Sequence, residues 1–220
     1  LFQNKKIIHE IPSHFAVDSI PTLGSPVGLS GEILTCTVLC MCILEKHYDD
    51  LMQVVEGTGI RVQDTIASPL AASLVGITKT QKSAGCILVN IGSDTTSLII
   101  YEDDVPLAIH ILPEGSVAIT HDIALSLKVS LDEAERLKRG SSLYATDFKT
   151  KVHSIASKRI KSITTSITSF ARSLGEEHIF PAGILIVGGG SLLTSIEDMV
   201  RTSSKLPVTL PRLQVLGKKY

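Results

Sequence analysis

Residues 86–100, CILVNIGSDTTSLII, say more about the architecture than any other part of the chain. Two apolar runs rich in Ile, Val and Leu flank a short turn of Gly, Ser, Asp and Thr, and this pattern predicts two paired strands. Gly92 allows the backbone to approach a ligand closely, while successive turn amides and the hydroxyls of Thr95 and Thr96 can donate to phosphate oxygens. The segment is therefore either a phosphate-binding hairpin or a purely structural one.

A second glycine cluster lies in residues 183–200, GILIVGGGSLLTSIEDMV. The order of residue types predicts a buried strand, a triple glycine at residues 188–190 and an amphipathic helix. Glycines remove Cβ atoms where a flat base or a ribose would lie, and amides at a helix start offer partial positive charge to phosphate. The cluster matches neither the dinucleotide fingerprint nor the Walker A loop. It is therefore either part of a nucleotide site or a tight strand-to-helix turn.

The composition is that of a globular chain of 220 residues, with 44% hydrophobic residues and a mean hydropathy of +0.29. This length suits one large or two small domains. The longest mainly apolar stretch, residues 33–44, is too short to span a bilayer and predicts a core strand. Because the net charge is −1 and no basic patch is visible, we expect no nucleic-acid partner. We expect no signal peptide at Leu1, and a start inside a longer protein, because the first residue is not Met.

Three of the four cysteines, Cys36, Cys40 and Cys42, lie in one apolar segment. Zinc sites usually pair two closely spaced ligands with a second pair farther along, and Cys86 alone does not supply that pair. We therefore expect these cysteines to act as small core residues. Free thiols without a disulfide framework fit a reducing cytoplasm.

Helical periodicity marks the rest of the chain. The segments with this spacing, by residue number, are 48–55, one that begins at 68–69, 121–127, 131–138 and 148–174. Residues 1–43 instead have extended β patterning, interrupted by a stretch rich in Pro, Gly and Ser at 21–31.

Taken together, these motifs resemble the FtsA branch of the actin-like ATPases, the cytoplasmic actin homologues of bacterial cell division. Residues 11–18 (IPSHFAVD) and 25–31 (SPVGLSG) look like consecutive signatures of the domain inserted in that family. Three further stretches look like its second phosphate hairpin, its nucleotide-facing helices and its adenosine motif. These stretches are 87–97, then 121–124 (HDIA) with 132–138 (DEAERLK), and 188–191 (GGGS). PilM-like proteins of type IV pilus assembly share the fold and the insertion, and they are the nearest alternative.

The resemblance implies an α/β, actin-like ATPase (ribonuclease H-like) fold that is partial and carries a remnant of the inserted FtsA/SHS2-type domain. Residues 1–43 would be part of the inserted SHS2-type domain, and 44–83 the C-terminal part of the first actin-like lobe. Residues 84–220 would form the second lobe, with a shortened helical subdomain at about 117–150. We also expect residues 1–43 to project and to meet a neighbouring subunit or an assembly partner.

In this family two hairpins clamp the phosphates and Mg²⁺, so the resemblance implies ATP and Mg²⁺ as cofactors, with a full site that needs residues upstream of Leu1. The residues implied in nucleotide binding are Gly92, Ser93, Asp94, Thr95, Thr96, Glu135, Lys138, Gly188, Gly189, Gly190 and Ser191. For Glu135 and Lys138, three apart on one helix, a simple exposed ion pair is the alternative.

Three departures from the family pattern argue against efficient hydrolysis. Asn90 stands where the family usually has Asp, so it would reach the metal only through water and without a negative charge. Asp94 stands where Gly is frequent, and Ser97 replaces a further frequent Asp. We therefore expect at most a weak ATPase.

The function implied is that of an ATP-binding cytoskeletal adaptor of bacterial cell division, acting by nucleotide-dependent assembly and partner docking. Its implied partners are the tubulin-like division protein FtsZ and further copies of itself. The chain ends at residues 217–220, soon after the last strand-like segment, so we expect no membrane anchor in it, and a cytoplasmic protein that reaches the inner face of the membrane through partners. Alternatives are a PilM-like pilus protein, a degenerate non-hydrolysing fragment and a sugar-kinase-type phosphotransferase, for which no catalytic carboxylate is apparent.

Overall fold

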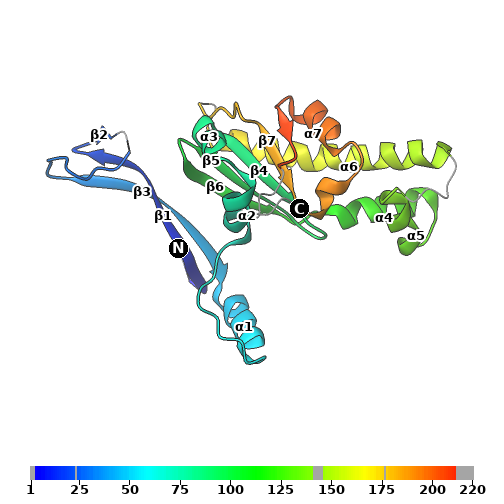
Figure 1. The fold of residues 1–220 in the computed structure, drawn as a ribbon, viewed down its shortest axis with the longest axis horizontal. Helices are drawn as coiled ribbons and strands as arrows, with labels where there is room; N and C mark the ends of the chain where they lie inside the picture. The colour runs from blue at the N-terminus through cyan, green and yellow to red at the C-terminus, as the bar shows by residue number, and fades with distance from the viewer. Residues whose placement is uncertain (1–2, 23, 141–145, 176, 212–220) are drawn as a thin grey trace, which may run out of the picture.

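The computed structural model describes residues 3–22, 24–140, 146–175 and 177–211, which form a three-stranded and a five-stranded sheet with helices around the larger one (Figure 1). The elements in chain order are β1 (Lys5–Val17), β2 (Ile20–Pro21), β3 (Leu34–Leu44), α1 (Glu45–Glu56), α2 (Ser68–Gly76), α3 (Lys79–Ala84), β4 (Cys86–Ile91), β5 (Thr96–Glu102), β6 (Val105–Leu112), α4 (Ser116–Leu127), α5 (Leu131–Lys138), α6 (Thr146–Ser173), β7 (Ile184–Val187), the 3₁₀ helix η1 (Gly189–Leu192), α7 (Ile196–Ser204) and β8 (Val208–Thr209).

The larger sheet has the strand order β6-β5-β4-β7-β8. Strands β4, β5 and β6 form an antiparallel meander, whereas β7 pairs parallel to β4 and β8 parallel to β7. The two strands predicted within residues 86–100 are confirmed. They are the first hairpin of this sheet, with Asn90 opposite Ser97.

Both faces of this sheet are covered, which explains why β4 is an almost continuous apolar run. Ile87 and Val89 belong to a core that includes Ile160 and Ile163 of α6. Leu88, between them, faces the other way and joins a second core that includes Met41 of β3. The helix α2 and the inner part of β3 cover this second face.

The predicted helices are confirmed. The long α6 runs beside the sheet, and its N-terminal half projects beyond it together with α4 and α5 (Figure 1). Arg159 of α6 ties this projection together, because its guanidinium makes two hydrogen bonds of 2.7 and 2.8 Å to the Asp122 carboxylate of α4. The predicted helix at 121–127 begins earlier, at Ser116. Part of the predicted subdomain at about 117–150 lies outside the described residues.

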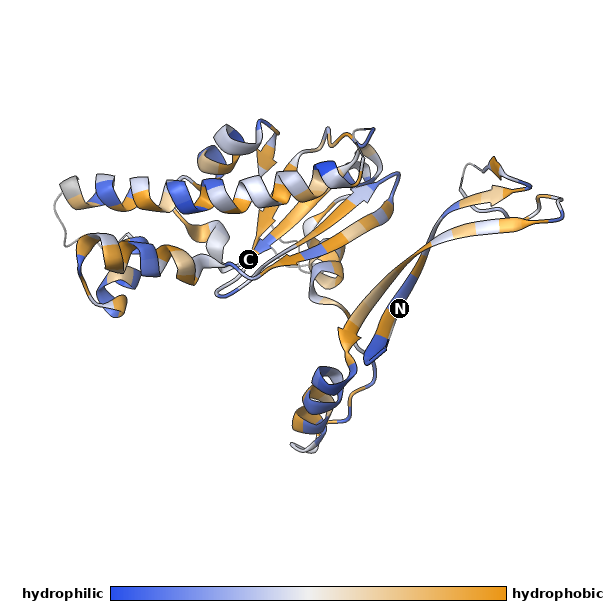
Figure 2. Ribbon diagram, turned by 180° about the vertical axis from the view of Figure 1, so that it is seen from behind, coloured by the Kyte–Doolittle hydropathy of each residue, from blue (hydrophilic) through white to orange (hydrophobic). Residues whose placement is uncertain are grey.

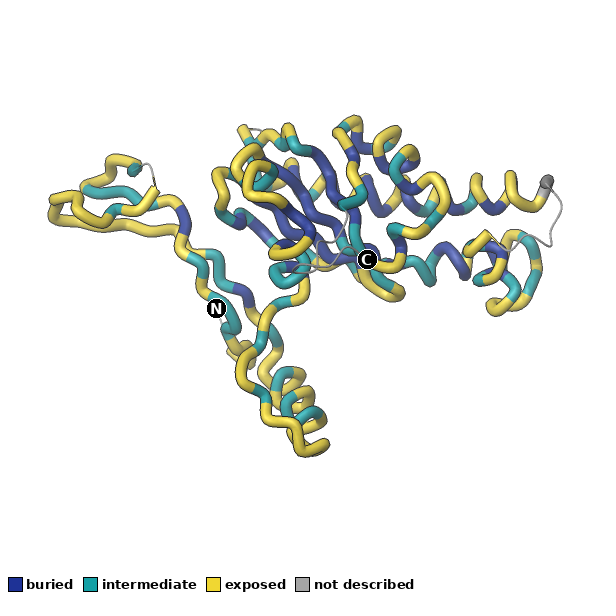
Figure 3. Tube along the Cα trace, in the orientation of Figure 1, coloured by how far each residue is buried: buried dark blue, intermediate teal, exposed yellow. Residues whose placement is uncertain are grey.

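Strands β1, β2 and β3 form an arm that projects from the larger sheet (Figures 1 and 3). Figure 2 shows that hydrophobic residues make up much of β3 itself. The prediction that residues 33–44 form a core strand is wrong for most of its length. Of the eleven residues of β3, Met41 alone is buried, since only the inner end of the strand packs on the body. The apolar residues of β3 predict a covered strand, but the described residues leave most of β3 exposed.

The prediction that the clustered cysteines are core residues is wrong for the same reason. Cys36 and Cys42 are exposed on the arm and Cys40 is half-buried, whereas Cys86, in the first strand of the larger sheet, is fully buried. None of the helices formed by the described residues combines the length and the apolar character that a membrane crossing requires. The prediction about residues 217–220 concerns positions outside the described residues.

Candidate functional site

A cavity of about 700 Å³ lies where the β4–β5 turn, the start of η1 and the helices α4 and α5 meet. It contains members of both glycine clusters, Gly92 from the hairpin and Gly189 and Gly190 from the triple glycine. The two glycine clusters, far apart in the sequence, therefore face one cavity through these residues. Ser93, Glu135 and Lys138, also predicted as site residues, line the same cavity, together with Ser116, Thr120, Asp132, Arg139 and Leu192.

The hairpin turn is fixed by the first amides of α4. The Ser116 N–H donates to the Gly92 carbonyl and the Val117 N–H donates to the Ser93 carbonyl, both at 2.9 Å. A Cβ atom on Gly115 would overlap the Ser93 backbone, so a glycine there allows the helix start to approach the turn. These two amides are therefore engaged by the protein itself.

The other hairpin residues predicted for the site, Asn90, Asp94, Thr95 and Thr96, are not among the residues that line the cavity. Asp94 and Thr95 are exposed at the turn, and Asn90 is half-buried on β4. The prediction that the Thr96 hydroxyl donates to phosphate does not hold in this structure. Its side chain is fully buried and its Oγ1 donates to the Glu114 carbonyl at 2.7 Å. That bond anchors the loop that leads into α4.

The three consecutive glycines have different structural roles. Gly188 has a φ of +86°, and a Cβ atom on it would collide with Asn90 Oδ1 and the Ile91 carbonyl oxygen. A Cβ atom on Gly190 would collide with the Ile91 side chain. Gly189 differs, since a Cβ atom there would meet no heavy atom of the described residues within 4 Å. Gly188 and Gly190 thus allow close packing on β4, and Gly189 leaves space.

The helix predicted directly after the glycines begins later than expected. Residues 189–192 form η1, and α7 starts at Ile196. Within this 3₁₀ turn the Ser191 hydroxyl donates to the Gly188 carbonyl at 2.6 Å. The amides nearest the glycines therefore belong to a short 3₁₀ turn and not to the first turn of the amphipathic helix.

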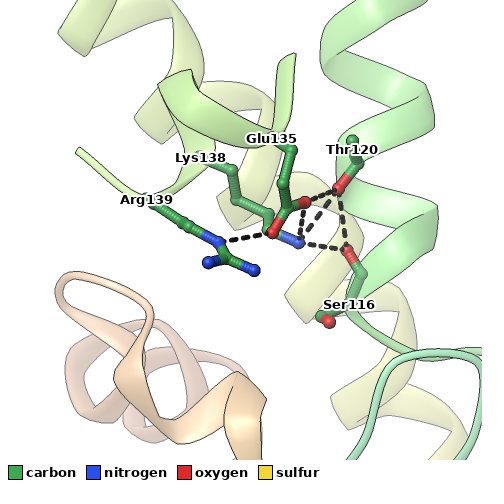
Figure 4. Close-up of polar contacts among 5 residues, drawn as sticks. All are labelled: Ser116, Thr120, Glu135, Lys138 and Arg139. Atoms are coloured by element: carbon green, nitrogen blue, oxygen red, sulfur yellow. Dashed lines mark hydrogen bonds and ion pairs between the residues drawn. The ribbon is translucent and has the colours of Figure 1, made fainter. Parts of the chain in front are cut away.

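A polar network joins α5 to α4 at the edge of the cavity (Figure 4). Lys138 Nζ lies 2.7 Å from Glu135 Oε2 and also donates to Thr120 Oγ1 at 2.9 Å and to the Ser116 carbonyl at 3.1 Å. The Thr120 hydroxyl donates to Glu135 Oε2 at 2.6 Å, and Arg139 Nε donates to Glu135 Oε1 at 2.8 Å. The Lys138 side chain is only 9% exposed, so the pair is not the simple exposed ion pair left open above.

Sequence reasoning missed Ser116, Thr120 and Arg139. The i, i+4 spacing of Ser116 and Thr120 places them on one helix face, but only the packing of α5 on α4 shows that this face meets Lys138.

Glu135 is held in its charged form. Burial on its own would raise the pKa of Glu135, but hydrogen bonds from Lys138, Thr120 and Arg139, with the charge of Lys138, outweigh burial and lower the pKa to about 2. A fixed carboxylate beside a nearly buried ammonium is suited to accept hydrogen bonds from hydroxyls and not to transfer protons near neutral pH.

This lowered pKa predicts a loss of stability in acid. The folded-state pKa lies below the unfolded one, so the contribution is complete above about pH 4.5 and is lost as the pH falls towards about 2. Glu135→Gln should lower the free energy of unfolding at pH 7 by about 1–2 kcal/mol and flatten its decline in this acid window. Urea unfolding of both proteins across the window is the measurement, and an unchanged acid slope in Glu135→Gln would contradict the assignment.

Solved structures define the class of the fold. A chain of the PilM-PilN type IV pilus biogenesis complex superposes with a TM-score of 0.66 at 18% identity, covering 90% of this chain and 55% of that one. MreB5 of Spiroplasma citri bound to AMPPNP also gives a TM-score of 0.66, at 16% identity, covering 77% of this chain and 60% of that one. The protein therefore has the actin-like ATPase fold.

The family model for cell division protein FtsA matches residues 87–216, more than half of the chain. The chain belongs to the FtsA family. The cell division protein FtsA of Borreliella burgdorferi is 24% identical over 229 aligned positions, which cover 94% of this chain and 55% of that protein. The chain spans about half the length of the curated relatives it matches.

Proposed function

We propose that the cavity between the β4–β5 turn, η1 and α4–α5 binds an adenine nucleotide, as part of an actin-like protein of cell division. The observation that carries this proposal is that backbone-exposing residues Gly92 and Gly189 face the same cavity as the Glu135–Lys138 pair. Glycines on one side and a charged pair on the other suit a ligand that combines a flat base, a ribose and phosphates. The likeness to MreB5 bound to AMPPNP supports this ligand class.

Each side of the cavity suits one part of the ligand. The free space above Gly189, with Gly190 beside it, suits the base, and the Glu135 carboxylate can accept hydrogen bonds from ribose hydroxyls. Lys138 adds positive charge. Turn residues Gly92, Ser93, Asp94 and Thr95 are the proposed phosphate side, while Gly188 and Ser191 shape the backbone around the base. The Thr96 hydroxyl is not part of this phosphate side, because it donates to the Glu114 carbonyl.

Calorimetric titration of the chain with ATP and ADP tests this proposal. We expect binding weaker than micromolar, because the first phosphate hairpin of the family lies upstream of Leu1 in family order and supplies part of the charged contacts. ATP should compete with ADP for one site. Absence of binding at millimolar nucleotide would overturn the proposal, and micromolar or tighter affinity would show that the other hairpin is not needed.

Asn90→Asp should strengthen the dependence of nucleotide affinity on Mg²⁺. The new side chain has almost the same shape, so the close approach between Asn90 Oδ1 and Gly188 is kept while a charge is added. We expect about a threefold to tenfold gain in affinity with Mg²⁺ relative to the unsubstituted chain, and no gain in EDTA. An equal effect with and without Mg²⁺ would show that residue 90 does not act through a metal. In a completed site the same change should raise any slow hydrolysis.

We infer from family membership that the whole protein acts in cell division through self-association and docking to the tubulin-like protein FtsZ, in the cytoplasm at the inner face of the membrane. Residues 1–43 are then part of the inserted SHS2-type domain, with its boundary at the junction of β3 and α1, followed by the end of one lobe at 44–83 and a second lobe at 84–220. Co-sedimentation of the longer protein with FtsZ filaments, with and without ATP, tests the docking, and failure to co-sediment in both conditions would contradict it.

A further inference from the structure

The long helix α6 carries positive charge without balancing acidic residues. Its residues 148–173 contain six of the 21 Lys and Arg residues of the protein and no Asp or Glu. Because the net charge of the whole chain is −1, this positive charge is a local feature that the composition does not reveal. Helical spacing also separates the basic residues along the sequence, so no basic patch is visible there.

Four of the basic residues share the outer side of α6 with three hydroxyl residues. At 3.6 residues per turn these seven residues fall within about a quarter of the circumference, opposite the buried Ala156 and Ile167. We call this set the basic stripe, and all its members are exposed: Lys151, Ser154, Lys158, Lys161, Thr165, Ser169 and Arg172. At 1.5 Å per residue the stripe is about 30 Å long.

The positive charges of the basic stripe are not neutralised by other described residues. Lys158, Lys161 and Arg172 form no ion pair with the part of the chain that the structure describes. Lys151 is near an aromatic ring, with its Nζ 6.0 Å from the centre of Phe148. The stripe therefore presents its charges to the surroundings of the protein.

The acidic residues of the helices that flank α6 are paired elsewhere. On α4, Asp122 binds Arg159, which lies off the stripe. On α7, Glu197 and Asp198 lie near the guanidinium of Arg201, at 3.9 and 2.7 Å. These carboxylates are therefore engaged by basic residues outside the stripe.

The basic stripe is remote from the arm. Helix α6 packs on one face of the larger sheet through residues such as Ile160 and Ile163. The inner part of β3 and the helix α2 cover the other face. The exposure of the stripe therefore does not depend on how the arm is completed.

We propose that the basic stripe binds the surface of a membrane that contains anionic lipids, with α6 lying along the plane of the headgroups. Ammonium and guanidinium groups donate to phosphate oxygens, and the hydroxyls between them can donate as well. The proposal rests on the membrane location in the proposed function and names a surface that would meet the lipid directly.

A lipid surface is the occupant because the stripe is long, straight and free of anchoring side chains. An array of anionic headgroups can meet all four basic residues at once along about 30 Å. The stripe contains no aromatic residue on which a nucleic-acid base could stack. It also contains no apolar residue of the kind that anchors a peptide in a protein interface.

Co-sedimentation of the 220-residue chain with lipid vesicles tests the proposal. We expect binding to vesicles of phosphatidylcholine with about one third phosphatidylglycerol, and no binding to phosphatidylcholine alone. About 1 M salt should release the chain, since the Debye length is then about 3 Å.

The double variant Lys158→Glu, Lys161→Glu assigns the binding to α6. It should weaken vesicle binding at least about tenfold, because each basic residue near an anionic surface contributes about fivefold. The charge-matched control Lys5→Glu, Lys79→Glu changes exposed lysines of β1 and α3 and should bind almost as well as the unsubstituted chain. Thermal unfolding of all variants checks folding, and Lys158→Gln, Lys161→Gln replaces the glutamate pair if that variant does not fold.

Four results would overturn the proposal: no binding to the anionic vesicles, equal binding to phosphatidylcholine, equal weakening by the control pair, or binding to polyglutamate in place of vesicles. The last result would assign the stripe to an acidic protein. Lys158 and Lys161 do not line the nucleotide cavity, so calorimetric titration with ATP should be unchanged in the double variant. Failure of the membrane surface and failure of the nucleotide site can therefore be told apart.

Discussion

Gly189→Ala is expected to weaken adenine-nucleotide binding by about tenfold, or about 1.4 kcal/mol, while it leaves the free energy of unfolding nearly unchanged. The reason is the free space at this position, where a Cβ atom meets no heavy atom of the described residues within 4 Å yet lines the cavity. The added methyl would occupy volume that we assign to the ligand. Calorimetric titration and urea unfolding of the same preparation measure the two quantities.

Gly188→Ala is the matched control and should do the opposite. An alanine at residue 188 would have to adopt a φ of +86°, which side chains disfavour, and its Cβ atom would collide with Asn90 and the Ile91 carbonyl. We therefore expect a loss of about 2–4 kcal/mol of stability. If both variants lost only stability, the open position would have no ligand role. If Gly189→Ala bound ATP as well as the unsubstituted chain, the base would have to lie elsewhere.

Lys138→Met is the second change with a large expected effect, a loss of about 2–3 kcal/mol in the free energy of unfolding at pH 7. Lys138 is 9% exposed and donates to three oxygens, so its removal leaves the partly buried Glu135 carboxylate without its main partner and raises the pKa of Glu135. Nucleotide affinity should fall as well, since the cavity loses a positive charge.

Arg139→Met provides the comparison for this prediction, because Arg139 contacts the same carboxylate from a side chain that is 77% exposed. Exposed ion pairs contribute little, so this change should cost less than about 1 kcal/mol. Urea unfolding of both variants shows whether the loss of stability depends on the burial of the basic side chain or only on its positive charge. Equal losses would mean that the buried position of Lys138 does not matter.

Much of the larger sheet could be predicted because its signal is local. The apolar runs on either side of Gly92 require a covered hairpin, and the helical spacing from 148 to 174 requires one long helix. The prediction for β3 is wrong because an apolar run shows that a strand needs to be covered but not which residues cover it. Its inner residue Met41 is buried and its outer residue Leu34 is exposed, although both belong to one strand.

The sequence predicts which glycines belong to the candidate site, but it does not predict which atoms these glycines and the polar side chains of the site contact. The sequence alone cannot separate Gly188 from Gly189, because the difference arises from their distance to β4. The burial of Lys138 likewise depends on Thr120, which lies on another helix. Thr96 illustrates the reverse error, since a hydroxyl in a plausible turn is used by the protein's own backbone at Glu114.

The bonds between the hairpin turn and the start of α4 have a mechanical consequence. The Gly92 and Ser93 carbonyls are held by the Ser116 and Val117 amides, and the Ser116 carbonyl in turn receives the ammonium of Lys138 on α5. A shift of the turn would therefore either break these hydrogen bonds or move α4 and α5 with it. A ligand that repositions this turn would therefore act on α4 and α5 through these bonds, and on α6 through the Arg159–Asp122 pair, so the projection beyond the sheet would respond to it as one unit.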